Sequence, residues 1–462
     1  MLEKFDLKKI LSATLHRGGE FADIYCEETE GIQLIAEERK LEKINPSIDC
    51  GIGIRLLWEG KTSYGFTNEL SEKSLLELAE TVSQAASAKK FDQTISLHSI
   101  NPPFHFTIEK ATEKSPLEKK RDWMREAEEA AWGFDSRIHQ VKVLYADIRK
   151  RVEIANSLGE LTRDDRTYTL FYVQAIAGQN GQIQTGYHPV GGLIGLELFD
   201  QHPPVSVARR ACEQAIRMLA ARKAPGGQMP VVISSEAGGT MIHEAVGHGL
   251  EADLASEGLS VYHKKIGERI GGEKISVVDD ATLPTRRGSF VFDDEGVPAE
   301  RTLLVDHGIL KNYMYDRKMA MKDGARPTGN GRRESYRFRP ICRMTNTMIL
   351  PGTDDPDSIL RSTERGLFVK KMGGGQVNTV NGDFIFEINE GCLIEKGQIG
   401  DPVRGAVLTG NGPHVLKIID KVGSDLGFGI GTCGKDNQGV PVGDAQPTIR
   451  IPELVVGGQL ES

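Results

Sequence analysis

Residues 240–250 read Thr-Met-Ile-His-Glu-Ala-Val-Gly-His-Gly-Leu, with a glutamate directly after the first of two histidines. These histidines, His243 and His248, are five residues apart, whereas those of the common zinc-protease pattern are four apart. On a regular α-helix, residues four apart are separated by ~40° around the axis and residues five apart by ~140°. A regular helix therefore cannot direct both imidazoles at one metal ion.

A π-helical turn, with hydrogen bonds between residues five apart, brings such positions back to one side of the helix. We expect a turn of this kind around Val246, Gly247 and His248, because glycine tolerates distorted backbone and the close approach of neighbours. The alternative is that both histidines are ordinary interfacial residues on an apolar helix. The adjacent Glu244 and the second imidazole favour a hydrolytic metal site instead.

Length and charge exclude several classes of protein. A chain of 462 residues is too long for one compact core, so two or three domains are expected. The net charge of -8 provides no electrostatic basis for binding nucleic acid or an anionic membrane. No apolar stretch approaches the ~18 residues of a membrane span, and the N-terminus lacks a secretory signal. Six cysteines without a C-x-x-C pair indicate a reducing, cytoplasmic compartment.

The pattern of apolar residues predicts an α+β protein in three parts, residues 1–110, 111–225 and 226–462. The first two parts are α+β units, each with its own antiparallel sheet, and the third is a β-rich barrel or sandwich that carries the histidine helix. Expected helices span residues 5–15, 70–88, 116–132 and 205–222. Expected strands of the first two sheets include residues 22–27, 32–36, 51–58, 141–146, 151–155, 168–177 and 182–187.

Two histidines do not complete a catalytic zinc site, which usually has three protein ligands and one open position. Glu251, Asp253 and Glu257 are close in sequence, but their spacing matches no familiar zinc protease, and we expect them to be solvated surface acids. Cys433 is the better candidate, because a thiolate binds zinc strongly and nearby glycines allow close approach. The glycine runs at 373–375 and 427–431 are not followed by the Lys-Ser or Lys-Thr pair of a phosphate-binding loop and predict tight β-turns.

Several further segments occur in order along the chain and together resemble the TldD/PmbA family of zinc peptidases, on the metal-bearing TldD side. The resemblance runs through nearly the whole chain and is densest after residue 226. The segments are residues 243–249, 339–347, 373–377 and 402–406, Cys433-Gly434-Lys435, Pro441-Val442-Gly443 and Gln446-Pro447-Thr448.

This resemblance implies zinc bound by His243, His248 and Cys433, with Glu244 as the general base that activates a zinc-bound water. It also implies a peptidase that cleaves unfolded or extended polypeptides. The enzyme is expected to be a dimer that encloses the active site, formed either with itself or with a metal-lacking PmbA-type subunit.

Two other functions remain open at this point. One is a non-catalytic peptide-binding or scaffold subunit of a peptidase complex, and the other is a dipeptidyl-peptidase type of zinc hydrolase with the same histidine spacing. A sheet edge near the site is a candidate for binding substrate as an added strand. The sequence does not identify the residue that stabilises the oxyanion, for which the candidates are His263, His414, Tyr313, Tyr336 and Arg343.

Overall fold

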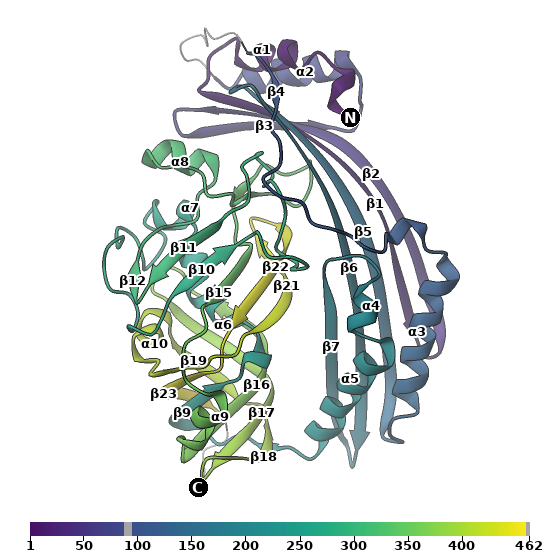
Figure 1. The fold of residues 1–462 in the computed structure, drawn as a ribbon, viewed down its shortest axis with the longest axis vertical. Helices are drawn as coiled ribbons and strands as arrows, with labels where there is room; N and C mark the ends of the chain where they lie inside the picture. The colour runs from purple at the N-terminus through teal and green to yellow at the C-terminus, as the bar shows by residue number, and fades with distance from the viewer. Residues whose placement is uncertain (87–94, 459–462) are drawn as a thin grey trace.

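The computed structural model describes residues 1–86 and 95–458 and shows two lobes (Figure 1). The chain up to residue 219 forms a long, curved sheet with helices packed against it, and the chain from residue 227 onward forms a β-rich lobe. Helices and largely antiparallel sheets occur together, so the predicted α+β class is confirmed.

The strands of the N-terminal lobe form one seven-stranded sheet, in the order β3-β2-β1-β5-β6 with β4 and β7 both paired to β6. Because β1 pairs with β5 along almost its whole length, the prediction of two separate sheets is wrong. Alternating side chains predict strands, but they do not specify which strand edges meet. The strands are β1 (Phe21–Glu37), β2 (Lys40–Trp58), β3 (Lys61–Thr67), β4 (His98–Ser99), β5 (Ile138–Asn156), β6 (Glu160–Gln179) and β7 (Gln182–Leu193).

Strand β1 is continuous where the sequence predicted two short strands separated by a turn. Gly31 lies within this strand, and a Cβ at this position would be 2.4 Å from the carbonyl oxygen of Asp147 on β5. The glycine therefore allows close pairing rather than a turn. The true turn follows at Glu38 and Arg39, whose φ values of 52° and 62° are those of a two-residue hairpin loop.

Helices cover both ends of this sheet. Two of them bury apolar residues against β1 and β2, and two others cover β5, β6 and β7. The predicted helices at 116–132 and 205–222 are confirmed, whereas the helix predicted at 70–88 ends earlier, and residues 87 and 88 lie outside the described residues. The helical segments are η1 (Leu2–Lys4), α1 (Leu7–Leu15), α2 (Glu72–Ser83), η2 (Thr112–Lys114), α3 (Leu117–Trp132), α4 (Leu198–Gln201) and α5 (Pro204–Leu219).

The C-terminal lobe contains an eight-stranded sheet that closes on itself. In the order β16-β9-β23-β19-β17 each strand pairs with the next, and β17 pairs again with β16. This ring is the barrel-like architecture expected from the many short strands. The strands are β8 (Arg222–Lys223), β9 (Gly227–Ile233), β16 (Arg365–Val377), β17 (Asp383–Glu395), β18 (Gln398–Arg404), β19 (Val407–Asn411), β20 (Lys421–Val422) and β23 (Ile449–Gly457).

A six-stranded sheet lies beside the barrel in the order β12-β11-β10-β15-β22-β21, so that β21 is its last strand. A separate two-stranded ladder joins β13 to β14. The strands are β10 (Val277–Asp280), β11 (Arg301–Asp306), β12 (Ile309–Leu310), β13 (Gly331–Arg332), β14 (Ile341–Cys342), β15 (Asn346–Ile349), β21 (Gly427–Lys435) and β22 (Gln438–Gln446).

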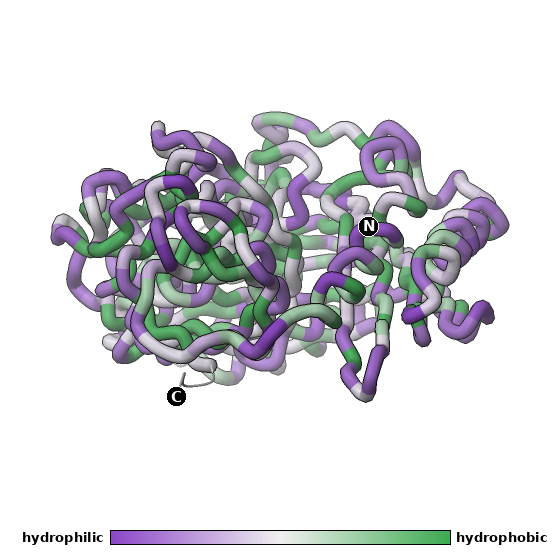
Figure 2. Tube along the Cα trace, turned by 90° about the horizontal axis from the view of Figure 1, so that it is seen from below, coloured by the Kyte–Doolittle hydropathy of each residue, from purple (hydrophilic) through white to green (hydrophobic). Residues whose placement is uncertain are grey.

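Short helices connect these strands, and the chain from α6 to η5 carries both histidines of the motif. Hydrophobic residues concentrate inside the C-terminal lobe, and hydrophilic residues gather on its outer loops (Figure 2). The helical segments are η3 (Ser235–Ala237), α6 (Thr240–Ile242), η4 (His243–Gly247), η5 (His248–Leu250), α7 (Ala252–Ala255), α8 (Arg317–Asp323), α9 (Pro356–Arg361) and α10 (Gly412–Ile418).

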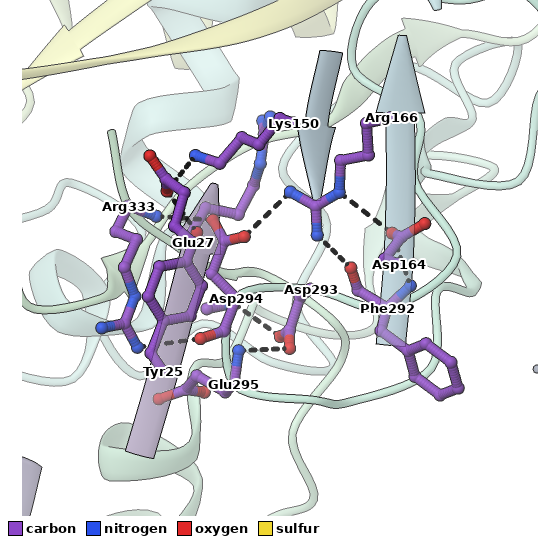
Figure 3. A network of polar contacts seen from close by, with 12 residues as sticks. Tyr25, Glu27, Lys150, Asp164, Arg166, Phe292, Asp293, Asp294, Glu295 and Arg333 are labelled. Carbon is purple, nitrogen blue, oxygen red and sulfur yellow. Dashed lines mark hydrogen bonds and ion pairs between the residues drawn. The ribbon is translucent and has the colours of Figure 1, made fainter. Parts of the chain in front are cut away.

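Buried charged side chains join the two lobes (Figure 3). The guanidinium of Arg166 on β6 lies 2.9 Å from Asp164 on the same strand and 2.8 Å from Asp294 of the C-terminal lobe. Arg333 donates a second hydrogen bond to Asp294, at its carbonyl oxygen, and lies 4.0 Å from the ring centre of Tyr25 on β1. The curved sheet is therefore attached to the C-terminal lobe through specific ion pairs. Over the described residues, no helix is both long and apolar enough to cross a membrane.

Candidate metal centre

The histidine motif lies on a π-helical turn, as its spacing predicted. Residues His243–Gly247 form η4, in which the backbone N–H of His248 donates to the carbonyl oxygen of His243 five residues earlier. Gly247 faces Met344, whose sulfur would lie 2.1 Å from a Cβ at this position. The widened turn lets both imidazoles reach the same point, and the glycine allows that turn to pack against the six-stranded sheet.

Three potential metal donors converge at this turn. One donor atom each of His243, His248 and Cys433 lies within 4.8 Å of the other two, and the Cys433 Sγ is 3.4 Å from the His248 Nε2. Cys433 comes from β21, 185 residues beyond His248 in sequence. His243 and Cys433 are 4% and 5% exposed, so the cluster is almost enclosed by protein.

The chemistry of this donor set fits zinc. Imidazole and thiolate are its usual ligands, with bond lengths of about 2.0–2.1 Å and 2.3 Å, which place two tetrahedral ligands roughly 3.6 Å apart. The observed separation of 3.4 Å between the Cys433 sulfur and the His248 nitrogen agrees with that value. The buried Nδ1 of His243 has no hydrogen-bond partner within the described residues.

The electrostatics of the cluster favour the thiolate form of Cys433. Burial raises the pKa of this thiol, but hydrogen bonds and positive charge from His243 and His248 outweigh burial and lower the pKa to about 5. A thiolate rather than a thiol is therefore the form present at neutral pH, and the thiolate is the form that binds metals.

A buried carboxylate orients His248. The Glu251 Oε2 lies 3.0 Å from the His248 Nδ1 and accepts a 2.9 Å hydrogen bond from the Lys435 Nζ. Burial raises the pKa of Glu251, but Lys435 and His248 outweigh it and lower the value to about 2. Lys435 also donates to Asp253 at 2.6 Å. Such outer carboxylates fix the orientation and raise the basicity of a ligating histidine.

The expectation that the nearby acids are all solvated surface residues is therefore wrong for two of them. Glu251 is fully buried and Asp253 half-buried, whereas Glu257 is exposed and pairs with Lys322. The position of Glu251 three residues after His248 was a usable signal, because residues three apart on a helical turn are neighbours. The role of Lys435 could not be found in this way, because it reaches the site from β21.

Glu244 points into an open cleft of about 660 Å3 beside the three donors. Its side chain is 26% exposed, and its Oε2 lies 4.0 Å from the His248 Nε2. Burial raises the pKa of Glu244, and the two imidazoles oppose that shift. A carboxylate with a raised pKa is a stronger base than a free one, which suits proton transfer.

Two strands border this cleft. Residues 430–435 of β21 line one side, residues 375–377 of β16 line another, and Thr240 and Asp444 complete the walls near the histidines. The two glycine runs lie on these strands, so the prediction that they form tight turns is wrong. A bulge in β16 between Met372 and Gly375 shifts its register against β17. In both strands glycine leaves room at the edge of the cleft.

The residues considered for the oxyanion do not line the cleft. Each is engaged elsewhere or lies at the surface, and Arg343 instead supports the backbone of Cys433. Tyr313 donates to the Tyr262 carbonyl, Tyr336 to Asp49, and Arg343 to the carbonyls of Cys433 and Gln438; the His263 ring contacts the Ala255 carbonyl, and His414 is exposed.

Comparison with known proteins matches family models over most of the chain. Residues 226–458 match the PmbA/TldA metallopeptidase C-terminal domain, residues 110–219 the central domain and residues 22–88 domain 1. A metalloprotease TldD homologue of Haemophilus influenzae is 36% identical over 98% of this chain and 96% of its own length. A zinc metalloprotease TldD homologue of Saccharolobus solfataricus is 28% identical over 96% and 97% of the two chains.

Solved structures share the fold over the same length. A Thermotoga maritima protein, described as a candidate modulator of a DNA gyrase, aligns with a TM-score of 0.80 at 24% identity, covering 95% of this chain and 96% of its own. TldE from Thermococcus kodakarensis aligns with a TM-score of 0.73 at 16% identity, covering 95% and 97%. At these identities the structures establish the fold alone.

Proposed function

Because the chain belongs to the TldD/PmbA family, whose relatives are named metalloproteases, we propose that it is a zinc-dependent peptidase acting on unfolded or extended polypeptides. The metal ligands in this proposal are His243, His248 and Cys433, and Glu244 is the general base. The observation that carries the proposal is the convergence of three zinc-type donors beside an accessible carboxylate in one cleft.

Zinc bound by this set supplies a Lewis acid that polarises a peptide carbonyl and makes water more acidic. The protein's own part in the reaction is proton transfer and orientation. Glu244 accepts a proton from the attacking water at a carboxylate oxygen and delivers it to the leaving amine. Glu251 keeps His248 oriented by its hydrogen bond to Nδ1, so that Nε2 remains directed at the metal position.

The shape of the cleft supports an extended substrate. β21 is the last strand of its sheet and has a strand partner only in β22 within the described part of the chain. A peptide in extended conformation can add to such an edge through backbone hydrogen bonds, with little selection for side chains. A folded domain does not present a free extended segment to this edge, so the preferred substrates are unfolded chains.

The test compares metal content and peptide cleavage in two variants of the purified chain and in one control variant. Glu244→Ala should keep its zinc and lose cleavage, because it removes the base but no ligand. Cys433→Ala should lose zinc, whereas Cys50→Ala, which removes a thiol from the N-terminal sheet, should retain both metal and activity. Full zinc occupancy in Cys433→Ala would exclude the ligand assignment. A folded sample with neither metal nor cleavage would favour the scaffold-subunit alternative.

We also propose that the active form is a dimer, either of two copies or with a metal-lacking partner of the PmbA type. The fold shared with TldE supports a partner of this type. Light scattering on the purified chain, with a peptidase assay on the same fractions, separates the two cases. An active homodimer would remove the need for a second subunit, and an inactive sample that gains activity with a PmbA-type subunit would establish it.

A further inference from the structure

A second cavity, of about 480 Å3, lies between the two lobes where α5 and β7 face β16. It is separate from the metal cleft and is lined almost entirely by charged side chains. The basic residues that line it come from three elements: His188 from β7, Arg210 and Arg217 from α5, and Lys370 and Lys371 from β16.

The acids of this cavity are paired with only part of the basic set. Buried Glu390 accepts a hydrogen bond from Arg217 and lies 3.6 Å from Lys370, which is also 3.8 Å from Glu236. The remaining acid, Glu213, is exposed at the surface of α5 and forms no ion pair within the described residues. Lys371 and Arg210 likewise have no ion-pair partner in the part of the chain that the structure describes.

Lys371 is held by neutral groups only. Its Nζ donates to the Gln214 Oε1 at 2.8 Å and to the Tyr187 carbonyl at 3.3 Å, which leaves one of its three N–H donors unused. Burial, together with the charges of Lys370 and Arg210, lowers the pKa of Lys371 although Glu390 and Glu236 oppose the shift. An ammonium in such surroundings is stabilised when an anion binds beside it.

The same positive charges affect the pKa of His188, the histidine of the cavity. Burial, followed by the charges of Lys371 and Arg210, lowers the pKa of His188 to about 3. His188 is therefore uncharged at neutral pH and adds no positive charge of its own, but its ring can still donate a hydrogen bond to an incoming anion. The cavity combines an ammonium, a guanidinium and an imidazole that have no acid bound to them.

The same two segments border this cavity and the metal cleft. On β16, Lys370 and Lys371 line the cavity, and residues 375–377 line the cleft. The second segment, from η3 to η4, contributes Glu236 to the cavity and His243 to the cleft. Strand β9 pairs with β16 only up to Val369, so beyond that residue β16 has no partner on this edge within the described chain. Lys371 lies five positions before Gln376 on β16, so an extended peptide along this strand would advance about five residues between the cavity and the cleft.

We propose that this cavity is a subsite for a carboxylate group of the extended peptide substrate, about five residues along the peptide from the part that lies in the metal cleft. Lys371 and Arg210 bind the carboxylate oxygens, and His188 donates a further hydrogen bond. The proposal rests on the peptidase function proposed above and gives that function a substrate class, peptides with an acidic side chain or a free C-terminus at this distance. The cavity, of about 480 Å3, has room for a side chain or a chain end that carries a carboxylate.

The test measures binding rather than turnover, so that it does not depend on catalysis. Fluorescence anisotropy on Glu244→Ala protein compares four labelled dodecapeptides of one sequence, with glutamate or glutamine side chains and with a free or amidated C-terminus. The same series is measured with Lys371→Gln and Arg210→Gln added. Arg209→Gln is the matched control, because Arg209 is the exposed neighbour of Arg210 on α5 and does not line the cavity.

At least one carboxylate-bearing peptide should bind about tenfold more tightly than the neutral peptide. If the change from glutamate to glutamine removes this advantage, the side chain is its source, and if amidation removes it, the C-terminus is. Lys371→Gln and Arg210→Gln should abolish the advantage, and Arg209→Gln should keep it. Equal binding of all four peptides would overturn the subsite, as would an advantage that survives both substitutions. If a single-stranded oligonucleotide competes with the peptides, and this competition is lost in Lys371→Gln, the cavity binds phosphate and the carboxylate proposal is wrong.

Exposed Arg210 is removed without disturbing the core, so Arg210→Gln remains informative even if Lys371→Gln folds poorly. The two proposals fail separately in this design. If all four peptides bind equally to the Glu244→Ala protein while the unsubstituted chain cleaves peptides normally, only the subsite is excluded. Absence of cleavage with an intact carboxylate preference would exclude the peptidase assignment and leave a peptide-binding protein.

Discussion

At the scale of single residues, the site depends on groups that do not touch the metal position. Glu251 and Lys435 form a chain of hydrogen bonds behind His248, with no exposed surface at Glu251. The Lys435 ammonium gives the buried Glu251 carboxylate a charged partner in addition to the His248 ring, and the carboxylate holds the imidazole. The two side chains come from opposite ends of the C-terminal lobe's sequence, as His248 and Cys433 do.

Removing this support should weaken metal binding without removing a ligand. Glu251→Gln and Lys435→Met should each lower zinc affinity by about 10- to 100-fold, because the ring of His248 loses its fixed orientation and some of its basicity. Competition with a chelator of known zinc affinity measures the change. Glu257→Gln, which alters an exposed acid six residues after Glu251, should have no effect on zinc affinity. Unchanged affinity in both Glu251→Gln and Lys435→Met would contradict the supporting role.

At the scale of secondary-structure elements, the π-helical turn η4 decides whether the motif can work. It brings His243 and His248, which are five residues apart, to one side of the helix, and Gly247 lets the turn pack against Met344, between β14 and β15. A regular helix would direct the two imidazoles apart. The turn therefore depends on close packing at Gly247 and not on helix propensity alone.

Gly247→Ala should disturb this turn. The added methyl group would meet the Met344 sulfur, so we expect a loss of about 1–3 kcal/mol in unfolding free energy and weaker zinc binding. Urea denaturation and metal analysis measure the two effects. Gly374→Ala is the matched control, since a Cβ there meets no atom within 4 Å and its backbone has no positive φ. Equal stability of the two variants would show that the packing at Gly247 is not restrictive.

At the scale of the whole molecule, buried ion pairs fix the curved sheet against the C-terminal lobe (Figure 3). Arg166 is the central member, with Asp164 on its own strand, Asp294 across the junction and the Phe292 carbonyl as acceptors. Burial raises the pKa of Asp294, but Arg166 and Lys150 outweigh it and lower the value to about 2. The pairing of charges across the junction also positions α5 and β7 opposite β16, where the second cavity lies.

Arg166→Met should be strongly destabilising, by about 3–5 kcal/mol, because it leaves two buried carboxylates without their cation. Arg149→Met on the neighbouring strand removes a comparable pair at the surface, in which the guanidinium lies 2.6 Å from Asp165. Solvent screens that pair, so its loss should cost about 1 kcal/mol or less. Urea unfolding of both variants gives the comparison. Similar losses would mean that the junction does not depend on buried charge.

The junction also makes stability depend on pH. Burial, followed by the charge of Glu295, raises the pKa of Asp316 from 3.8 to about 7. The folded chain thus keeps a proton that the unfolded chain releases above about pH 4, and this contribution to stability is lost as pH rises toward 7. Asp316→Asn should make the melting temperature fall less between pH 4 and 7. Asp355→Asn, at the exposed N-cap of α9, should leave the profile unchanged. A profile of Asp316→Asn that follows the parent's would exclude this assignment.

Local patterns were sufficient for much of the fold. Apolar spacing located α3 and α5 nearly residue by residue, and the β-rich character of the last part was evident from its short strands. The glycine runs misled, since glycine is used in β16 and β21 to leave space at a cleft rather than to turn the chain. The domain boundaries at about residues 110 and 225 remain predictions, although one sheet spans the first of them.

The sequence by itself determined the distorted helical turn, because the angle per residue of a helix is fixed and five-residue spacing cannot align two ligands without an i→i+5 bond. It also made a thiolate the best third ligand on chemical grounds. Only the tertiary structure decided that Cys433 reaches the histidines, that Lys435 and Glu251 support His248, and that Lys371 lines a cavity in which it is held by neutral groups. The physical reason is that these contacts join residues far apart in the chain, and their distances follow from how sheets pair and pack, which no local periodicity records.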